Sequence, residues 1–358
     1  MELQNIDRIA VFKMRNIGDV LMITPLLRAL RETFPQARIT AVVNSGTEAM
    51  LAGNPHLDET LVYRRPPLGG LRDEFRLVRE LRRRRFDLTI GLTEGDRTAW
   101  YSLLCGAPRR IGLPRYSWGK FDPRRRAYNF PVYPPLRGGI HEVEKHFWLI
   151  EHAGLKLAPP SSKNLCLVVS DEMRAWARAE MAPLRPARIV HVHPVSRWLW
   201  KCWGNEAMAA VIDWLETERD TRVIVTTGPA PPERDRAREI VRLCRTRPRF
   251  YDGDLSLAQT AALSAGSDGY FGVDTAPMHM AAAVGVPVVA LFGPSQAGNW
   301  GPWTTRGRVL SHPCACHEAK RASCDWSRVR ACLAAITVAE AQAALDEMLA
   351  LPLPTTPS

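Results

Sequence analysis

Short apolar segments alternate with longer segments of helical period along most of the chain. The segment Ile9–Met14 is apolar and β-branched, and beyond it apolar positions recur at helical spacing through Val20–Thr33. Similar patterns predict further strands at Arg38–Val43 and Phe86–Leu92, and further helices at Leu71–Arg85 and His141–Ala153. The stretch 108–138 is rich in Pro, Arg and aromatic residues without a clear period, and we expect it to be loop.

The alternation restarts after a segment rich in Pro and Ser, Ala158–Ser162, which has the composition of a linker. The pattern then predicts strands and helices in turn, at Ile189–Val192, Glu206–Glu218, Val223–Thr227, Pro232–Arg245, Gly269–Val273, Ala276–Val284 and Val286–Phe292. Strands that alternate with helices form parallel sheets with right-handed crossovers. We therefore expect an α/β fold with two Rossmann-like domains, residues 1–160 and 161–337, whose parallel sheets face a cleft. Residues 338–358 form a C-terminal helix, Val338–Leu349, and a tail, and we expect this helix to pack back across the interface.

The overall composition is compatible with this two-domain arrangement. The chain has 358 residues, of which 46% are hydrophobic and 24% charged, so a sizeable core can be buried. The nearest approach to a membrane span, Met280–Phe292, is short and is interrupted by Gly285 and Pro287. The N-terminus carries Glu2 and Asp7 and lacks a signal-peptide layout, so we expect a cytoplasmic protein.

The positive charge lies mainly in the first part of the chain. Residues 1–160 contain 26 Lys and Arg against 17 Asp and Glu, whereas residues 161–358 contain 22 against 20. A basic first domain indicates an anionic partner, and nucleic acid, anionic lipid and a phosphorylated sugar all fit at this stage. The alternative is that the Arg residues only keep the surface soluble.

The eight cysteines argue against a disulfide framework in a cytoplasmic chain. Four of them lie close together in the sequence, near His312 and His317: Cys314, Cys316, Cys324 and Cys332. This spacing fits a zinc site poorly, because zinc sites favour closer pairs of Cys. Buried thiols or a redox-dependent crosslink are the alternatives, and we assign no metal site.

The loop after the first strand contains the first candidate for chemistry, Asp19. Ligands of open α/β sheets bind at the carboxyl ends of the strands, and Gly18 allows a ligand to approach the backbone closely. Asp19 then begins a helix, so the alternative is that its carboxylate only caps the free N–H groups there. The residues of this loop by themselves favour the capping role.

In the second domain, the segment Val273–His279 follows a strand and opens a helix, with Pro277 in the first turn. The free N–H groups and positive end of such a helix form an anion site. Thr275 adds a hydroxyl, and His279 lies on the same face of the helix, which together suit a diphosphate. Alternatively, Asp274 and Thr275 only cap the helix and His279 is a core histidine.

A loop with two cations and a hydroxyl follows the strand that ends at His193. It contains Ser196, Arg197 and Lys201. Cations at the carboxyl end of a strand are well placed to neutralise a departing phosphate. His191 and His193 share one face of the strand, but two ligands alone rarely hold a metal ion.

Weaker signals complete the inventory of motifs. Gly228, followed by Glu233, ends the next strand and is positioned to frame a nucleoside. No G-x-G-x-x-G follows the first strand and no P-loop motif is present, which counts against dinucleotide oxidoreductases and P-loop enzymes. The segment His141–His146 only mimics a zinc-protease motif, because Lys145 stands where the second histidine should be.

Taken together, these segments resemble the ADP-heptose:lipopolysaccharide heptosyltransferases of glycosyltransferase family 9. The matching segments are Asn16–Val20, His193–Trp203 and Gly272–His279, followed by Phe292-Gly293 before the segment Trp300–Trp303. The resemblance spans roughly residues 8–345, and its most specific part is Gly272–His279. The form His-Pro-x-x-Arg-x-x-x-Lys-Cys-Trp is most similar to that of the third heptosyltransferase, which adds a side-branch heptose.

The resemblance implies a GT-B fold, with the acceptor in the N-terminal domain and ADP-heptose in the C-terminal domain. It implies inverting transfer of heptose to the inner core of lipopolysaccharide without a metal or another cofactor. Asp19 would be the general base, and Lys201, with Ser196 and Arg197, would stabilise the leaving ADP. The other donor-binding residues would be Gly228, Glu233, Asp274, Thr275, Ala276 and His279.

The inner core also accounts for the basic first domain. It carries carboxylates and phosphates, and Arg binds both through paired hydrogen bonds. The acceptor-binding residues that we expect are Arg64, Arg65, Arg115, Arg124 and Arg125. Such a protein would make peripheral contact with the cytoplasmic face of the inner membrane and would bind no nucleic acid. Two alternatives stay open: a GT-B enzyme with another nucleotide sugar, and a non-enzymatic binder of anionic polymers.

Overall fold

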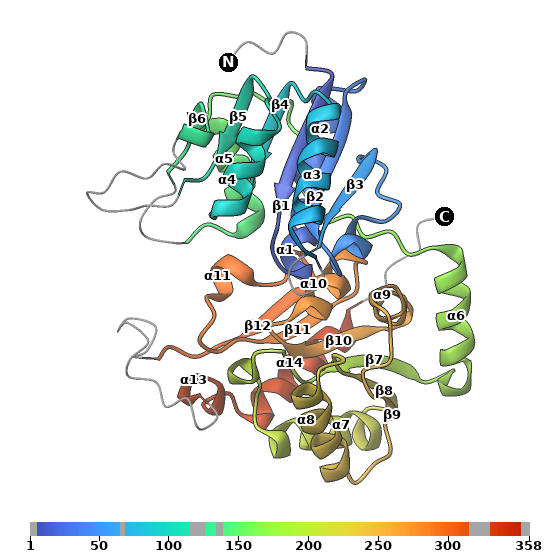
Figure 1. Cartoon of the computed structure of the whole chain (residues 1–358). Coiled ribbons are helices and arrows are strands. Elements are labelled where there is room, and N and C mark those ends of the chain that lie inside the picture. Colours follow the sequence, from blue (N-terminus) through green and yellow to red (C-terminus); the bar gives the residue numbers. More distant parts are fainter. Residues whose placement is uncertain (1–5, 65–68, 115–125, 134–138, 315–329, 352–358) are drawn as a thin grey trace. The chain divides into compact units, whose positions relative to one another are not determined.

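The computed structural model divides the chain into two compact units, residues 1–168 and 169–358. It describes residues 6–64, 69–114, 126–133, 139–314 and 330–351 (Figure 1). No helix in this part of the chain is long and apolar enough to cross a membrane. The segment expected to be the linker, Ala158–Ser162, precedes the division and lies on the first unit, where Ser161 donates to Glu32 and the carbonyl of Ser162 accepts from Arg28.

The first unit is built on a parallel sheet in which six strands are described, in the order β3-β2-β1-β4-β5-β6 (Figure 1). These strands are β1 Arg8–Lys13, β2 Arg38–Asn44, β3 Glu59–Tyr63, β4 Leu88–Gly91, β5 Arg109–Gly112 and β6 Phe130–Pro131. The helical segments are α1 Ile17–Leu21, α2 Thr24–Thr33, η1 Glu48–Leu51, α3 Leu71–Arg83, α4 Asp96–Leu104 and α5 Glu142–His152. The central strand β1 is buried from Ile9 to Lys13, as expected for a parallel strand covered on both faces.

The second unit repeats this arrangement with strands in the order β12-β11-β10-β7-β8-β9. The described strands are β7 Arg188–His193, β8 Thr221–Thr226, β9 Arg249–Tyr251, β10 Gly269–Val273, β11 Val288–Leu291 and β12 Gly307–Leu310. The helical segments are α6 Asp171–Met181, η3 Ala182–Leu184, η4 Leu199–Lys201, α7 Asn205–Glu218, α8 Pro231–Leu243, α9 Leu257–Gly266, α10 Ala276–Ala283, α11 Ala297–Trp300, α13 Ala331–Ala334 and α14 Val338–Ala350.

Each sheet has its first strand in the middle, and the chain turns back there to build the other side. This reversal lies between β1 and β4 in the first unit and between β7 and β10 in the second. Ligands of open α/β sheets bind at such a reversal, outside the carboxyl ends of the strands. The α/β fold with two Rossmann-like sheets, predicted from the sequence, is confirmed.

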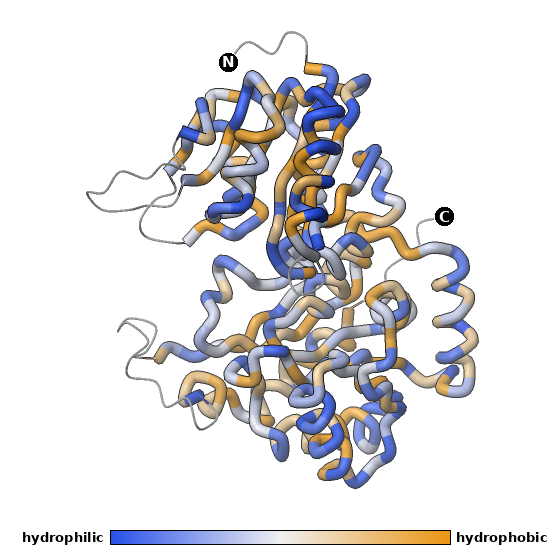
Figure 2. The backbone as a smooth tube through the Cα atoms, in the orientation of Figure 1, coloured by the Kyte–Doolittle hydropathy of each residue, from blue (hydrophilic) through white to orange (hydrophobic). Residues whose placement is uncertain are grey.

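Alternate residues of the second sheet face two separate apolar layers. Phe271 and Val273 pack with α7, α8 and α14, whereas Tyr270 packs with Met278 and other residues of α10. Figure 2 shows the middle strands of both sheets largely in the orange of hydrophobic residues. The C-terminal helix α14 is thus part of one layer of the second unit, and its further packing onto the first unit stays a prediction.

Two element predictions for the first unit are wrong. The helix expected over Val20–Thr33 is two helices, α1 and α2, because Pro25 at the start of α2 has no N–H to continue the helix and Thr24 donates its hydroxyl to the carbonyl of Leu21. The stretch 108–138, expected to be loop, contains the short strands β5 and β6. These strands have too few residues to show a period.

Candidate active site

Asp19 lies at the carboxyl edge of the first sheet, where β1 ends and α1 begins. The N-cap of α1 is Asn16, so Asp19 is the third helical residue and not the cap that the loop sequence favoured. One carboxylate oxygen, Oδ2, accepts from the backbone N–H and the side-chain amide of Asn16, at 3.3 and 3.2 Å. The other oxygen, Oδ1, lies 3.9 Å from Nζ of Lys13, and Asp19 is 7% exposed. The loop therefore fixes this carboxylate and leaves Oδ1 facing a buried cation.

That cation, Lys13, is the last residue of β1 and is 1% exposed. Its Nζ lies 2.6 Å from Oε1 of Glu142 and 3.1 Å from Nε2 of His146, and it donates to the carbonyl of Leu92 at 3.3 Å. Glu142 and His146 are one turn apart on α5 and both are buried. The first unit thus has a buried polar cluster of Lys13, Asp19, Glu142 and His146 at the end of its central strand.

The protonation states of this cluster follow from its packing. Burial alone would raise the pKa of Glu142, but the neighbouring Lys13, and after it His146, hold that pKa well below its usual range. Burial, with Lys13 beside it, lowers the pKa of His146 to about 4. His146 is therefore neutral at pH 7, and its Nε2 can accept a hydrogen bond from Lys13.

Sequence reasoning missed Lys13, Glu142 and His146 as site residues. Two signals were present: a lysine inside an otherwise apolar strand, and a Glu and a His four residues apart on one helix face. The segment His141–His146 was considered only as an imperfect zinc motif. Its actual partner, Lys13, lies far away in the sequence and reaches α5 only through the fold.

In the second unit, two residues predicted from separate motifs meet at the reversal of the sheet. Nζ of Lys201, in η4 after β7, lies 2.5 Å from Oδ2 of Asp274, which follows β10. Their side chains are only 13% and 7% exposed. Nζ of Lys201 also lies 4.9 Å from the ring of Trp198 and 5.3 Å from that of Trp200, within the range of cation–π attraction. Lys201 is therefore held from several sides.

Directly after Asp274, helix α10 presents its N-terminus at the same edge. Its N-cap, Thr275, has an extended backbone, and its side chain makes no capping hydrogen bond. The alternative in which Thr275 only caps the helix is therefore not supported. Pro277 lies in the first turn, and His279 is buried at 4% exposure. The N–H groups of the first turn have no partner within the helix, and this makes the end suitable for an anion.

The remaining donor-site candidates lie around the β7 and β8 loops. Glu233 is buried, and burial raises its pKa, while Arg197 opposes that shift. A Cβ at Gly228 would lie 2.6 Å from Oε1 of Glu233, so a larger residue there would require the Glu233 carboxylate to move. Ser196 is buried and its Oγ accepts from the N–H of Trp198 at 3.4 Å. Gly228, Glu233 and Arg197 are thus brought near one another.

The two strand histidines are engaged in a network of their own. His191 contacts the hydroxyls of Ser264 and Thr226 at 2.8 and 2.7 Å, and His193 contacts Thr226 at 2.8 Å. Burial lowers the pKa of both histidines to about 3, so they are neutral. Among the residues that the structure describes, no three His, Cys, Asp or Glu side chains are grouped to hold a metal ion. Of the clustered cysteines, Cys316 and Cys324 lie outside those residues.

Little of the predicted acceptor site falls within the described residues. Arg64 follows β3 and is exposed. The other four predicted arginines lie outside them: Arg65, Arg115, Arg124 and Arg125. Their role stays a prediction.

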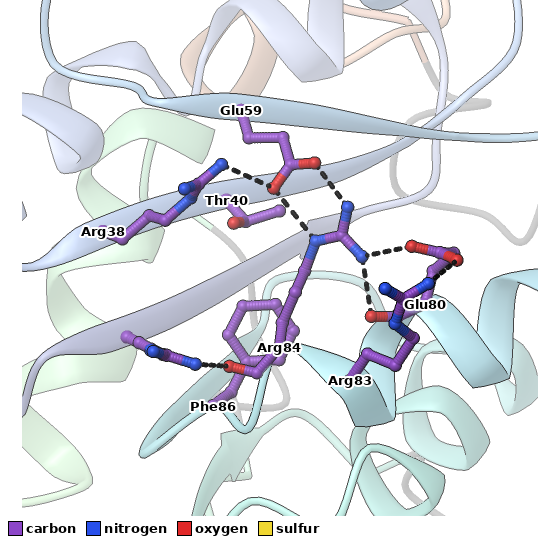
Figure 3. Close-up of a pocket in the computed structure, with 8 residues that line it drawn as sticks. Arg38, Thr40, Glu59, Glu80, Arg83, Arg84 and Phe86 are labelled. Carbon is purple, nitrogen blue, oxygen red and sulfur yellow. Dashed lines mark hydrogen bonds and ion pairs between the residues drawn. The ribbon is translucent and has the colours of Figure 1, made fainter.

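A cavity of about 300 Å³ lies at the opposite, amino edge of the first sheet (Figure 3). Arg84 binds Glu59 and Glu80 across it, and Arg38 approaches Glu59 at 3.6 Å. The pKa of Glu59 is lowered chiefly by its hydrogen bond from Arg84. Because these ion pairs join β2, β3 and the end of α3 away from Asp19, we interpret them as structural.

Comparison with known proteins identifies relatives over most of the chain. Residues 74–329 match the family model of glycosyltransferase family 9 (heptosyltransferase). The matched residues include the motifs of the second unit but not the loop of Asp19. Lipopolysaccharide heptosyltransferase 3 of Escherichia coli K12 is 28% identical over 296 residues, covering 81% of this chain and 84% of that protein.

Two solved structures from E. coli share the fold. The structure of ADP-heptose lps heptosyltransferase II has a TM-score of 0.77 at 21% identity and covers 96% of this chain and 98% of that one. Heptosyltransferase WaaC with ADP has a TM-score of 0.70 at 18% identity, covering 95% and 99%.

Proposed function

The chain belongs to glycosyltransferase family 9, the heptosyltransferase family, and on that premise we propose that it transfers heptose from ADP-heptose to the inner core of lipopolysaccharide. The names of its relatives support this donor and acceptor, since one solved structure is of an ADP-heptose heptosyltransferase and another contains ADP. The relative named heptosyltransferase 3 and the form of the segment His193–Trp203 support the third, side-branch heptose as the sugar added.

The observation that carries the proposal is the Lys201–Asp274 pair beside the start of α10. As the bond between the anomeric carbon and ADP breaks, negative charge builds on the diphosphate. Lys201, fixed by Asp274, would neutralise this charge together with Arg197 and the N–H groups of α10. These groups supply the stabilisation that a divalent cation otherwise provides, and the transfer we propose is independent of metal.

Asp19 would act as the general base. The acceptor hydroxyl gives its proton to Oδ1 of Asp19 while its oxygen attacks the anomeric carbon, and ADP leaves from the opposite face with inversion of configuration. The contact of 2.6 Å commits Lys13 mainly to Glu142. Oδ1 of Asp19, 3.9 Å from Lys13, is beyond hydrogen-bond distance of that cation, so it stays able to accept the proton.

The acceptor and the cellular location complete the proposal. The inner core offers carboxylates and phosphates to Arg64, Arg65, Arg115, Arg124 and Arg125. We place the enzyme in the cytoplasm, in peripheral contact with the inner membrane where its lipid-linked acceptor would be presented. Nucleic acid has no part in this reaction.

Binding of the leaving nucleotide tests the proposal without requiring the acceptor. Nucleotide bound only to the folded state, at a hundredfold excess over its dissociation constant, stabilises it by about 2.7 kcal/mol. We expect ADP to raise the melting temperature, UDP and oligonucleotides to leave it unchanged, and Lys201→Ala to reduce the effect of ADP. A larger rise with UDP would indicate another nucleotide sugar, and a rise only with oligonucleotides would indicate a binder of anionic polymers.

A further inference from the structure

Helix α3 exposes two large apolar side chains that no described element covers. Leu71 is 78% exposed and Phe75 is 73% exposed, whereas the other exposed large hydrophobic residues among those described reach at most 46%. The two are one turn apart, so they lie side by side on the helix surface. The opposite side of α3 is anchored: Leu77 and Leu81 are buried, and Glu74 accepts hydrogen bonds from Tyr63 and Tyr101.

The same exposed face carries a row of arginines. At about 100° per residue, all exposed positions of α3 fall within an arc of about 140°, and besides Leu71 and Phe75 they are Arg72, Arg76, Arg79, Arg82 and Arg83. The acidic residues of the helix lie outside this arc. Asp73 binds the backbone at the helix start, and Glu80 pairs with Arg84 and, at 3.5 Å, with Arg83. The face thus combines apolar and cationic groups without an acidic one.

Helix α4 extends the apolar part of this surface. It lies beside α3, as the hydrogen bond from Arg82 to the carbonyl of Leu104 shows. Trp100 is 46% exposed, and Leu103 and Leu104 are each 36% exposed. Five of the twelve exposed large hydrophobic residues among those described therefore belong to α3 and α4.

We propose that the exposed face of α3, with the neighbouring apolar residues of α4, docks the protein on an anionic lipid bilayer. Leu71 and Phe75 would enter the boundary between headgroups and acyl chains, and the arginines would contact lipid phosphates. Charge complementarity selects this partner, because the face carries five cations that match a surface of negative headgroups, and among the described residues an acid pairs with just one of them, Arg83. The protruding apolar pair distinguishes such a face from a purely electrostatic one.

The inference deepens the proposed function, since a membrane contact through α3 lies close in sequence to Arg64 and Arg65, which are assigned there to a lipid-linked acceptor. Its test nevertheless needs no transfer. If the protein docked on vesicles but transferred no heptose, the proposed function would fail and this inference would stand.

The test is cosedimentation of the full chain with vesicles of phosphatidylglycerol and phosphatidylethanolamine, compared with vesicles of phosphatidylcholine alone. We expect binding to the anionic vesicles only, weakening as salt is raised. Arg72→Gln/Arg76→Gln/Arg79→Gln should lower the partition coefficient roughly 100-fold, since each cation near an anionic surface contributes about fivefold. Leu71→Ser/Phe75→Ser should lower it at least roughly tenfold without any change of charge.

A matched triple variant on the second unit controls for net charge. Arg222, Arg242 and Arg247 are exposed there, and replacing all three by Gln removes the same charge. This control should bind vesicles like the wild type, and all variants should keep the wild-type melting temperature because the replaced side chains are exposed. Wild-type binding by both α3 variants, an equal loss in the control, or no vesicle binding by the wild type would each overturn the inference. If the wild type bound no vesicles and a protein partner instead covered the exposed face of α3, that face would be assigned to the protein partner.

Discussion

Lys13 is the residue on which the polar cluster of the first unit depends. It is fully buried, and its ammonium group is surrounded by Glu142, His146, the carbonyl of Leu92 and, farther away, Asp19. A buried lysine is costly unless it is paired, and here Glu142 provides the pair. Nζ of Lys13 also lies 3.9 Å from Oδ1 of Asp19, so the structural and functional roles of this lysine have to be separated by experiment.

Two variants separate these roles. Lys13→Met should lower the free energy of unfolding by about 3–5 kcal/mol, because Glu142 stays buried without its cation. Lys13→Met/Glu142→Leu should regain most of that loss, because an apolar pair can replace a buried ion pair. Transfer by the double variant should remain at least roughly tenfold slower, because Asp19 lacks its neighbouring cation. Urea unfolding and transfer rates measure the two effects, and a double variant with wild-type turnover would make Lys13 purely structural.

Lys201 should act on the leaving group. Lys201→Ala should lower kcat by roughly 10²–10³ and weaken ADP binding, because charge develops on the diphosphate as the bond breaks. The KM for the acceptor should change little. Lys163→Ala is a matched control, since Lys163 is also paired with a carboxylate, Glu144, but lies on the surface of the first unit. Steady-state kinetics that gave both variants wild-type values would restrict Lys201 to a structural role.

At the scale of elements, the close contact of β7 and β10 gives a sharp prediction. A Cβ at Gly272 would lie 2.5 Å from the carbonyl oxygen of His193. A Cβ is fixed to the backbone and the carbonyl oxygen is part of it, so the contact can be relieved only if the two strands move apart. Gly272→Ala should therefore lower the free energy of unfolding by about 1–3 kcal/mol. Gly298→Ala is the control, because a Cβ there meets nothing within 4 Å. Equal urea midpoints for the two variants would contradict this prediction, because they would show that β7 and β10 can move apart to accommodate the extra methyl group at little cost.

The elements that the sequence predicted well are those with long apolar or periodic segments. Strands such as β1, β7 and β10 were placed within a residue or two, and the site candidates after them followed from the rule that ligands bind at carboxyl ends of strands. Among the elements that the predictions missed are β3 and α4 of the first unit and α6, β9, α9 and β12 of the second. In β3 most side chains are only half-buried, and α4 contains few apolar residues at regular spacing. Local patterns do not reveal such elements, because neighbours far away in the sequence define them.

The same limit explains the missed part of the site. The pair Lys201–Asp274 joins two motifs that each had a recognisable local form. The contact of Lys13 with Glu142 and His146 joins β1 to α5, which lies far away in the sequence of the first unit. Neither segment alone reveals that the other is its partner. Only the parallel topology, which brings β1 to the centre of the sheet, places them together.

At the scale of the whole molecule, three buried histidines make stability depend on pH. The pKa of His146 is lowered to about 4, and those of His191 and His193 to about 3. Histidines in the unfolded chain have a pKa of about 6.5, so below that pH the unfolded chain binds protons that the folded chain does not bind. The contribution of these histidines to the free energy of unfolding should thus be complete above pH 6.5 and should decrease as the pH drops toward 4. At pH 5 the loss should be about 2 kcal/mol per histidine.

Urea unfolding at pH 7.5 and pH 5 measures this loss. His193→Asn should reduce the difference between the two pH values by about one third, because it removes one of the three groups. His152→Asn is the control, since His152 is exposed at the end of α5. A wild-type stability that is equal at pH 7.5 and pH 5 would mean that these histidines bind protons at pH 5 in the folded state as they do in the unfolded state.

The most direct test of the central claim is transfer by the purified protein from ADP-heptose to a truncated lipopolysaccharide core in the presence of EDTA. Mass spectrometry of the acceptor should show one added heptose, and one ADP should be released for each. Asp19→Asn should keep the fold and bind ADP, yet transfer roughly 10²–10⁴ times more slowly, because the acceptor hydroxyl then has no base. Transfer that fails with ADP-heptose but succeeds with another nucleotide sugar, or an Asp19→Asn variant as fast as the wild type, would contradict the account.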